Sequence, residues 1–479
     1  MCGGATRAAA CLALAFTGTA GAAWAEDPAP FRPLPSLEAP PPAPTESPTS
    51  LAPPQEEPNA APVTTAAPDT SAPPIAAAPA AASPPAQPSP PDAPPDAASP
   101  PLPPAPGFSL YGLPPLQVHG FASQGAIKST KNNYLVQHAT RGSFELTEAA
   151  INFTQPLTDR LRMGLQLFTS QIGAVGDFRV EADWYYLDYR FADWLGLRAG
   201  RTKVPFGLYN EINEIDAARV PILLPQAVYP LLSRDLLLAE TGLELYGYLR
   251  LAGAGGLEYR LYGGTLYSPP PAAMSGTTVT DFSIPYTAGG RLMWETPLEG
   301  LRVGGSYLTL RANAAAAITS SDPTMSATTL SQRLVFHLWM ASAEYARDDL
   351  LLAAEFGRWK GRLDSTTQTP MQPASAGLIQ ETDTRFYGMA AYRVTRWLMP
   401  GAYYGGLFHD RVGLMGPQRH QHDVAATLRF DVNAFWIVKV EGHYMLGTGD
   451  LSSELNGGTP TSMLADRWFV FLAKTTAYF

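Results

Sequence analysis

The chain has 479 residues, of which only 16% are charged, against roughly 25% in average soluble proteins. This composition excludes an ordinary soluble globule. The 33 Lys and Arg residues face 42 Asp and Glu residues, so the net charge is −9, and residues 26–106 supply −8 of it through nine acids and one arginine. The remainder is nearly neutral, so a nucleic-acid-binding protein, which needs a concentrated basic face, is not expected.

Residues 1–25 have the pattern of a secretory signal peptide. One basic residue, Arg7, precedes an apolar run and then small residues, and the predicted cleavage site lies before Glu26. The only cysteines of the chain, Cys2 and Cys11, lie in this segment. A lipoprotein cleavage box at Cys11 is the less favoured interpretation, because the apolar core before it would be too short. After cleavage before Glu26, the exported chain would have no thiol, no disulfide and no thiolate metal site.

Residues 26–106 are predicted to form a disordered Pro/Ala-rich periplasmic linker. They hold 29 of the 47 prolines and almost no aromatic residue, so little apolar surface is available to offset the entropy of ordering the chain. In polyproline geometry these residues would reach at most about 250 Å. A solvated spacer is the simpler interpretation, and a tether that reaches peptidoglycan or another partner is the sharper hypothesis.

From Leu116 onward the chain alternates apolar and polar residues with the period of two that is typical of strands. In Arg160–Ser170, Leu161, Met163, Leu165 and Leu167 form an apolar face, and the other face has Arg160, Arg162, Gly164, Gln166 and Ser170. Trp436–Tyr444 shows the same pattern, with Lys439, Glu441 and His443 on the polar face. Around Trp184–Asp188 the alternation loses its phase, which predicts a β-bulge. Because a soluble β-sandwich would show the same alternation, connection lengths are needed as a second criterion.

Connections of two kinds alternate along residues 107–479, as in barrels that join strands by short periplasmic turns and longer outer loops. The predicted short turns are Gln155–Asp159, Phe191–Asp193, Ala252–Gly256, Thr296–Gly300, Arg347–Asp349, Val394–Arg396 and Asp431–Ala434. The predicted loops are 128–141, 173–177, 203–238, 268–285, 312–332, 361–381, 410–421 and 447–465. Together they join about 16 strands, so we expect an all-β fold, a closed transmembrane antiparallel β-barrel. The tryptophans Trp194, Trp294, Trp397 and Trp436 lie beside short turns, where aromatic rings prefer the headgroup layer.

Four segments carry a resemblance to a known family. They are VHGFASQG at Val118–Gly125, GRTKVPFGLYNE at Gly200–Glu211, WIVKVEGHY at Trp436–Tyr444, and the terminal Phe479. The body of the chain resembles Gram-negative outer-membrane porins, closest to the phosphate-selective porin O and P type. The resemblance implies sixteen strands, a homotrimer, contact with outer-membrane lipids, and Phe479 as an assembly signal for the barrel-assembly machinery. Ala477 departs from that signal, which usually has a bulky residue at this position.

The resemblance also implies a third external loop that folds inward and narrows the pore. The matching loop is 203–238, and its charged residues are Lys203, Glu211, Glu214, Asp216, Arg219, Arg234 and Asp235. Three are basic and four are acidic, so this loop does not supply the rows of Arg and Lys that a phosphate-selective pore would have.

Side chains on the inward strand faces would line a hydrated lumen and determine its selectivity. Alternation places these residues there: Arg160, Arg162, Arg250, Arg260, Arg385, Arg393, Arg429, Lys439, Glu441 and Lys474. Over all predicted inward positions, ten cations face nine acids, which predicts no strong overall field. Most of these charges are expected to pair across neighbouring strands.

These patterns predict a porin of the cell outer membrane for passive diffusion of small hydrophilic solutes or ions, including anions such as phosphate. No reaction, no cofactor and no catalytic or metal site is predicted. The alternatives are a structural or adhesive barrel tethered by residues 26–106, and an outer-membrane enzyme that uses His409-Asp410 with His420 and His422. Two histidines at that spacing are usually only solvated, so the enzyme is the weaker alternative.

Overall fold

The computed structural model describes residues 114–479 except 174–175, 268–276, 319–327 and 370–371. The predicted signal peptide, residues 1–25, and the predicted linker, residues 26–106, lie outside the described residues. Within the described part of the chain, no helix is long and apolar enough to cross a lipid bilayer.

The described residues form sixteen β-strands, joined in chain order by antiparallel pairing. The first eight are β1 (Gln117–Ser129), β2 (Ser143–Pro156), β3 (Leu161–Ile172), β4 (Glu181–Ala192), β5 (Leu195–Lys203), β6 (Ala239–Arg250), β7 (Gly256–Thr265) and β8 (Thr277–Glu295). The last eight are β9 (Leu301–Ile318), β10 (Thr328–Arg347), β11 (Leu350–Thr369), β12 (Gln372–Tyr392), β13 (Leu398–Asp410), β14 (His420–Asn433), β15 (Trp436–Gly447) and β16 (Arg467–Tyr478). Short 3-10 helices lie in the connections: η1 (Asn210–Ile212), η2 (Asp216–Ala218), η3 (Leu231–Leu236), η4 (Ala252–Ala254), η5 (Gly416–Arg419) and η6 (Thr461–Met463).

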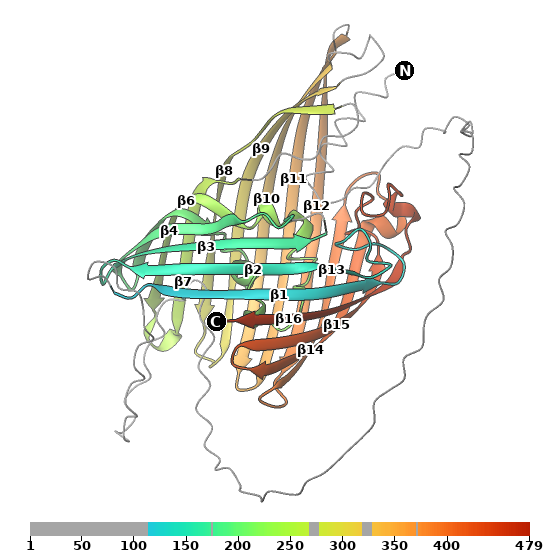
Figure 1. Ribbon diagram of the computed structural model, residues 1–479. Helices are drawn as coiled ribbons and strands as arrows, with labels where there is room; N and C mark the ends of the chain where they lie inside the picture. The colour runs from blue at the N-terminus through green and yellow to red at the C-terminus, as the bar shows by residue number, and fades with distance from the viewer. Residues whose placement is uncertain (1–113, 174–175, 268–276, 319–327, 370–371) are drawn as a thin grey trace, which may run out of the picture. The chain divides into compact units, whose positions relative to one another are not determined.

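The barrel closes because β1 pairs with β16 as well as with β2 (Figure 1). Phe121 lies opposite Tyr478, and the register continues to Ser129 opposite Val470. The backbone of Phe479 extends the closure, because its N–H donates to the Gly120 carbonyl at 3.0 Å and its carbonyl accepts from Gly120 at 3.1 Å. Among the sixteen described strands no edge is then left unpaired, which is what a sheet in lipid requires. The predicted all-β barrel of sixteen antiparallel strands is confirmed.

The two faces of the sheet follow the predicted alternation. On β15 Trp436, Val440 and Tyr444 are exposed on the outer face, while Lys439 and Glu441 are buried on the inner face. The four tryptophans expected beside short turns, Trp194, Trp294, Trp397 and Trp436, are all exposed. An apolar outer face with aromatic rings at its margin fits contact with lipid.

The predicted bulge in β4 is confirmed. Between β3 and β4 the register passes from Gln166 opposite Trp184 to Leu167 opposite Ala182, so Asp183 is the extra residue. A bulge lets the side chains on both sides of it reach the inner face. Asp183 is accordingly 3% exposed and Asp188 is 2% exposed.

Three predicted loops are wrong in extent. β8 begins at Thr277 within predicted loop 268–285, β9 and β10 extend into predicted loop 312–332, and β11 and β12 occupy most of predicted loop 361–381. These extensions contain Ala, Ser, Thr and Gln on both faces. A strand that rises beyond a lipid layer needs no apolar outer face, so its sequence loses the alternation on which the prediction depended. The long strands stand above the rest of the barrel in Figure 1.

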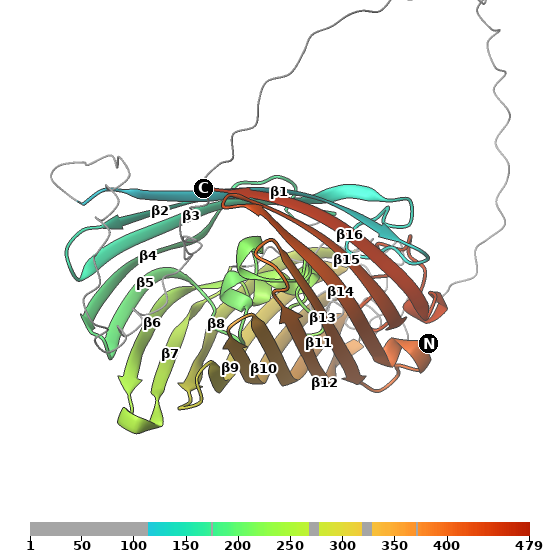
Figure 2. The same ribbon diagram turned by 90° about the horizontal axis from the view of Figure 1, so that it is seen from below.

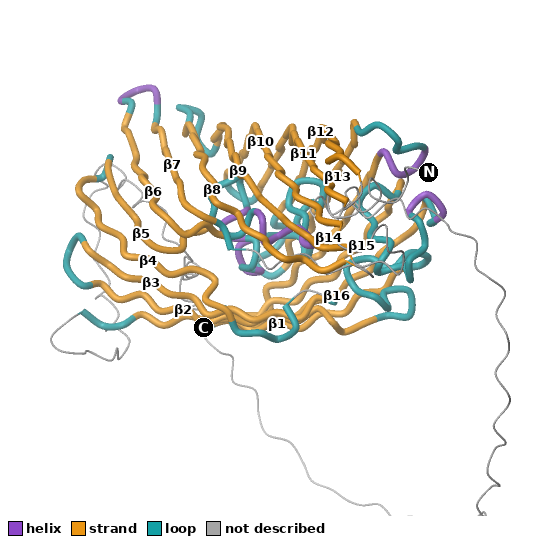
Figure 3. The backbone as a smooth tube through the Cα atoms, turned by 90° about the horizontal axis from the view of Figure 1, so that it is seen from above, coloured by secondary structure: helices purple, strands orange, loops and turns teal. Residues whose placement is uncertain are grey.

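The interior of the barrel contains the connection between β5 and β6. In Figure 2 the green chain that follows β5 lies within the ring of strands, and Figure 3 shows its short helices there. We call residues 204–238 the inward segment. It contains η1, η2 and η3.

Candidate functional site

The inward segment spans the lumen from one wall to another. It leaves the barrel at β5 and returns at β6. Near its start, the Leu208 N–H donates to the Glu355 carboxylate on β11 at 3.0 Å. Further along, Asp216 contacts Lys439 on β15 at 3.0 Å. The fold into the lumen that the resemblance implied for loop 203–238 is therefore the arrangement the structure has.

Apolar packing holds the first and last parts of the inward segment. Val204 and Phe206 are fully buried in one cluster with inward side chains of the wall. The wall residues of that cluster include Tyr262, Met293, Leu308, Leu310, Leu338, Met340, Tyr387 and Met389. Because each buried side chain of this size contributes roughly 1.5 to 3 kcal/mol, this contact stabilises the segment inside the barrel.

Glu355 on β11 holds the start of the segment by hydrogen bonds. Its carboxylate is 3% exposed and accepts from the hydroxyl groups of Tyr229 and Tyr387 and from Ser342. It also accepts from the Leu208 N–H. A buried carboxylate needs such donors, because leaving it without partners costs several kcal/mol.

Glu441 on β15 does the same for the far part of the segment, which we define as residues 216–224. Its carboxylate accepts from the backbone N–H groups of Ile222 and Leu223 at 2.7 and 2.9 Å. Thr427 and His443 on the wall also contact it, at 2.5 and 3.0 Å. Ile222 and Leu223 pack in a second apolar cluster whose wall residues include Ile127, Leu146, Ile172, Met445, Trp468, Val470 and Leu472.

Asp216 lies at the centre of a buried charge cluster. Its carboxylate is 3.0 Å from the ammonium of Lys439 and 3.7 Å from that of Lys474, and it accepts from the Thr476 hydroxyl at 2.9 Å. Arg219 approaches it to 3.6 Å. Burial raises the pKa of Asp216, but the surrounding cations outweigh burial and hold the pKa far below its ordinary value.

A second charge cluster links the end of β5 and the inward segment to β2 and β4. The Lys203 ammonium is 2.7 Å from Asp183 and 2.9 Å from Glu214. Glu214 also contacts the guanidinium of Arg234 at 2.7 Å, and Arg234 approaches Glu148 to 4.0 Å. The predicted loop charges Lys203, Glu214 and Arg234 therefore meet one another. The side chain of Asp235 lies outside the described part of the structure.

Glu211 in η1 contacts two arginines of the wall. Its carboxylate pairs with Arg260 on β7 and, at 2.8 Å, with Arg291 on β8. Burial raises the pKa of Glu211, but the two guanidinium groups outweigh it and lower the pKa to about 2. This ion pair therefore stabilises the fold above pH 4.5, and the stabilisation is lost as the pH falls towards 2.

We expect Glu211→Gln to remove that part of the acid sensitivity. The shift corresponds to stabilisation on the order of 3 kcal/mol at neutral pH. In thermal unfolding in detergent, the variant should be less stable than the parent at pH 7 and should lose less stability on acidification. The exposed loop residue Glu454, substituted as Glu454→Gln, is the control. An acid loss as large in Glu211→Gln as in the parent would refute this role of the ion pair.

The structure places most predicted pore-lining residues on the inner face. These are Arg162, Arg260, Arg385, Arg429, Lys439, Glu441 and Lys474. They pair locally: Lys474 contacts Glu148 at 2.6 Å, and Arg385 contacts Asp383 at 2.6 Å. Arg160 and Arg393 lie in short turns and Arg250 is the last residue of β6, so these three lie at the short-turn rim.

The inward cations Arg198, Arg291 and Arg302 are absent from the predicted pore-lining set. On β5 the apolar residues Leu195 and Leu197 alternate with Gly196 and Arg198, so the same pattern could have found Arg198. Arg291 follows Gly289 and Gly290, which weaken the alternation on β8.

Arg198 and Arg291 complete a row of alternating charges across six neighbouring strands. From β3 to β5, Asp188 contacts Arg162 at 2.7 Å and Arg198 at 3.2 Å. Glu244 then joins Arg198 at 3.4 Å to Arg260 at 3.0 Å. The row continues to Glu258 and Arg291 on β7 and β8, 2.8 Å apart.

A hollow of about 390 Å³ opens beside this row near the short turns. We call it the arginine vestibule. Six arginines line it: Arg160, Arg162, Arg190, Arg198, Arg250 and Arg260. The acids of its lining are Asp159, Asp188, Asp193 and Glu258. Arg162, Arg190, Arg198 and Arg260 pair with carboxylates, including Glu244 and Glu211 beside the vestibule. Among the described residues, Arg160 and Arg250 have no carboxylate within ion-pair distance, so these two cations are the ones left uncompensated in the lining.

Of the histidines considered for a hydrolytic or metal site, His420 and His422 are neighbours, with ring centroids 5.2 Å apart, but His409 lies on the opposite face of the sheet. His409 points inward and contacts Asp383 at 2.7 Å. His422 is on the outer face, where its ring stacks on Tyr404. Among the described residues, no group of three or more His, Cys, Asp or Glu could hold a metal ion.

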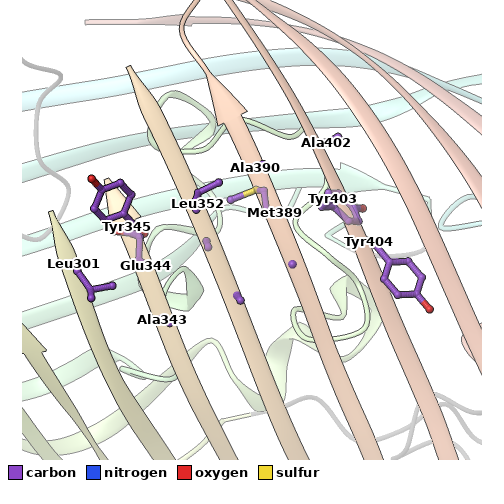
Figure 4. Close-up of a pocket in the computed structure, with 13 residues that line it drawn as sticks. Leu301, Ala343, Glu344, Tyr345, Leu352, Met389, Ala390, Ala402, Tyr403 and Tyr404 are labelled. Atoms are coloured by element: carbon purple, nitrogen blue, oxygen red, sulfur yellow. The ribbon is translucent and has the colours of Figure 1, made fainter. Parts of the chain in front are cut away.

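The outer face carries a shallow hollow of about 620 Å³ over β9 to β13 (Figure 4). Its floor consists of small residues of the outer face, including Ala343, Ala390 and Ala402. The rings of Tyr345 and Tyr404 lie at opposite ends of the hollow in Figure 4. The hollow therefore faces the surroundings of the barrel and not its lumen.

A closed barrel of sixteen strands with a segment folded into its lumen is porin-like in architecture. No family model matches the sequence, and no curated protein matches it. Solved barrels match its fold. OmpT of Vibrio cholerae is 10% identical over 76% of this chain and 98% of its own, with a TM-score of 0.48.

Two further solved structures are similar to a comparable degree. The outer-membrane channel DcaP of Acinetobacter baumannii is 12% identical over 78% of this chain and 99% of its own, with a TM-score of 0.46. OmpF of Salmonella typhi, in complex with daunomycin, is 14% identical over 76% of this chain and 98% of its own, with a TM-score of 0.46. At these values the likeness concerns the fold alone.

Proposed function

We propose that this protein is an outer-membrane channel for passive diffusion of small hydrophilic solutes, with a preference for small anions such as phosphate. The apolar outer face and charged inner face of the closed barrel support insertion into a bilayer. Export through a cleaved signal peptide, residues 1–25, belongs to the same proposal. No catalysed reaction and no cofactor are part of it.

The arginine vestibule is the observation that carries the anion preference. Guanidinium groups bind oxyanions such as phosphate through two parallel hydrogen bonds, and they stay charged at every physiological pH. Arg160 and Arg250 are exposed at the rim, where they are available to a passing ion. The inward segment would form the constriction, because it crosses the lumen between β5 and β15.

We expect Arg160→Gln with Arg250→Gln to reduce anion selectivity. Each unit charge about 8 Å from a passing ion changes the energy of that ion by a few tenths of a kcal/mol after screening, with opposite sign for anions and cations. Loss of two charges should lower the anion-to-cation permeability ratio about threefold to fivefold. Reversal potentials in a planar bilayer under a potassium chloride gradient measure this ratio.

Arg396→Gln is the matched control, because Arg396 is exposed in the short turn between β12 and β13 and does not line the vestibule. The control should keep the selectivity of the parent. A parent channel that prefers cations, or a double variant with unchanged selectivity, would count against the anion preference.

A structural or adhesive barrel tethered by residues 26–106 is the second candidate. Apolar packing of the inward segment favours it, since Phe206 on one side and Ile222 on the other are buried against the wall. Complete absence of channel activity in bilayers would support this candidate. Assembly as a homotrimer, recognition of Phe479 by the barrel-assembly machinery, and contact of the tail with peptidoglycan remain proposals that cross-linking in cells would test.

A further inference from the structure

Five basic side chains gather on the outer face of β9, β10 and β11. They are Arg311, Arg333, Arg358, Lys360 and Arg362, which we call the basic patch. Their chain neighbours point inward: Leu310 and Ala312 flank Arg311, and both are at most 2% exposed. Because side chains alternate along a strand, the five cations point away from the lumen.

Strand register makes the basic patch continuous. Val335 on β10 lies opposite both Arg311 on β9 and Arg362 on β11. Lys360 and Asp364 lie two residues before and two residues after Arg362 on β11. Lys360 is opposite His337, and Asp364 is opposite Arg333. Neighbouring strands are about 4.8 Å apart, so the long cationic side chains share one surface.

Asp364 is the acid within this surface, and it pairs with Arg362 at 3.0 Å. Among the described residues, Arg311, Arg333, Arg358 and Lys360 have no carboxylate partner within ion-pair distance. The patch therefore has a large positive excess, which calls for an anionic partner with several charges.

Its height on the barrel indicates where that partner lies. β11 begins at Leu350 directly after a short turn, and its outer face is apolar up to Phe356, with Leu352 and Ala354 between. From Leu350 to Arg358 the strand has nine residues, the length of a tilted strand that crosses the hydrocarbon layer. The basic patch thus begins where the hydrocarbon layer ends, on the side of the long loops.

Two further observations agree with this height. Lys360 lies over the ring of Trp339, 5.7 Å from its centroid, and Tyr307 packs against the same ring at 5.3 Å. Such rings prefer the headgroup layer. In addition, Lys360 lies opposite Thr382, and Thr382 lies opposite Asp410, the last residue of β13. Lys360 is therefore at the level where β13 ends on the side of the long loops.

We propose that the basic patch binds the phosphate groups of a multiply phosphorylated glycolipid in the leaflet on the long-loop side. Its acyl chains would run over Phe356 and Ala354 towards the hollow shown in Figure 4, whose lining includes Ala354. A soluble anion would make no use of this apolar surface below the cations. The inference rests on the proposed membrane insertion but not on conduction.

The test is native mass spectrometry of the full exported chain in nonionic detergent, titrated with bisphosphorylated lipid A. The variant Arg358→Gln, Lys360→Gln, Arg362→Gln should bind about 100-fold more weakly, because each cation near a lipid surface contributes about a fivefold change in affinity. Dephosphorylated lipid A should bind the parent as weakly as lipid A binds the variant. Inorganic phosphate at the same concentration should not compete.

The matched control removes three exposed cations from other positions on the long-loop side, as Lys128→Gln, Arg141→Gln, Arg467→Gln. Its affinity should stay within about twofold of the parent. Arg358→Lys with Arg362→Lys should retain most of the binding, which separates charge from folding.

Two results would overturn the proposal: equal binding of both forms of lipid A by the parent, or unchanged binding by the triple variant. Bilayer recordings distinguish a failure of the lipid-site proposal from a failure of the proposed channel function. A triple variant with normal channels and normal lipid binding refutes the lipid site alone. A chain that does not insert into bilayers refutes both.

Discussion

Asp216→Ala is expected to detach the far part of the inward segment from the wall and to destabilise the barrel by roughly 3 to 5 kcal/mol. The substitution removes the carboxylate that Lys439, Lys474 and Arg219 surround, and all three cations are buried. Removing one partner of a buried ion pair is costly because the remaining charges keep their desolvation penalty.

The measurement is hydrogen exchange of the far part, residues 216–224, together with the denaturant midpoint in detergent. Exchange at Ile222 and Leu223 should accelerate most, since their N–H groups bond to Glu441 next to the cluster. Asp410→Ala is the control, because Asp410 is an exposed acid at the end of β13. Protection equal to that of the parent would show that Asp216 does not hold the segment.

Gly207→Val is expected to destabilise the start of the inward segment by about 2 to 5 kcal/mol. Gly207 has φ +65°, a conformation that costs other residues roughly 1 to 2 kcal/mol. A Cβ at this position would lie 2.6 Å from the Tyr229 hydroxyl and 2.7 Å from the Glu355 carboxylate. The new side chain would therefore displace the hydrogen bonds between these groups and Leu208, at a further cost of about 1 to 3 kcal/mol.

Gly457→Val separates the two contributions. Gly457 has φ +68°, and no atom of the described residues lies within 4 Å of the position that a Cβ would take, so this variant has backbone strain without a clash. In thermal unfolding and in proteolysis of the segment, Gly207→Val should be clearly less stable than Gly457→Val. An equal loss of stability in the two variants would mean that the contact of residue 207 with Tyr229 and Glu355 does not contribute to the stability of the segment.

The strand number was predicted from the alternation of short turns and longer loops, and these connections are readable in the sequence where each strand has one apolar and one polar face. The same rule failed above the lipid, where strands β9 to β12 continue with Ala, Ser and Thr on both faces. There backbone pairing and small inward clusters, such as Ala316 with Leu330 and Leu334 with Leu363, maintain the strands, and the many small and hydroxyl side chains give only a weak hydropathy alternation. The predicted bulge succeeded because Asp183 and Asp188 would otherwise point to opposite faces.

The site was predicted only in part. The charged residues of the segment indicated ion pairs, but the apolar contacts that hold the segment were not predicted. Val204, Phe206 and Ile222 are buried within the lumen, and their partners Leu308 and Trp468 are apolar residues on inward positions. A barrel strand with two apolar faces indicates that another segment of the chain packs against its inner face. The ion pairs of Asp216 with Lys439 and of Glu211 with Arg291 join residues 223 and 80 positions apart, which no local pattern can match.

Single-channel conductance after replacement of residues 208–236 by a short Gly-Ser linker tests most directly whether the segment narrows a channel. The replacement leaves β5 and β6 intact and removes the chain that crosses the lumen. The conductance of the shortened barrel should rise several-fold over the parent, with weaker selectivity, because the lumen widens and the vestibule arginines lie further from the ion path. Equal conductance of the two proteins, or no conductance in either, would contradict a channel constricted by residues 204–238.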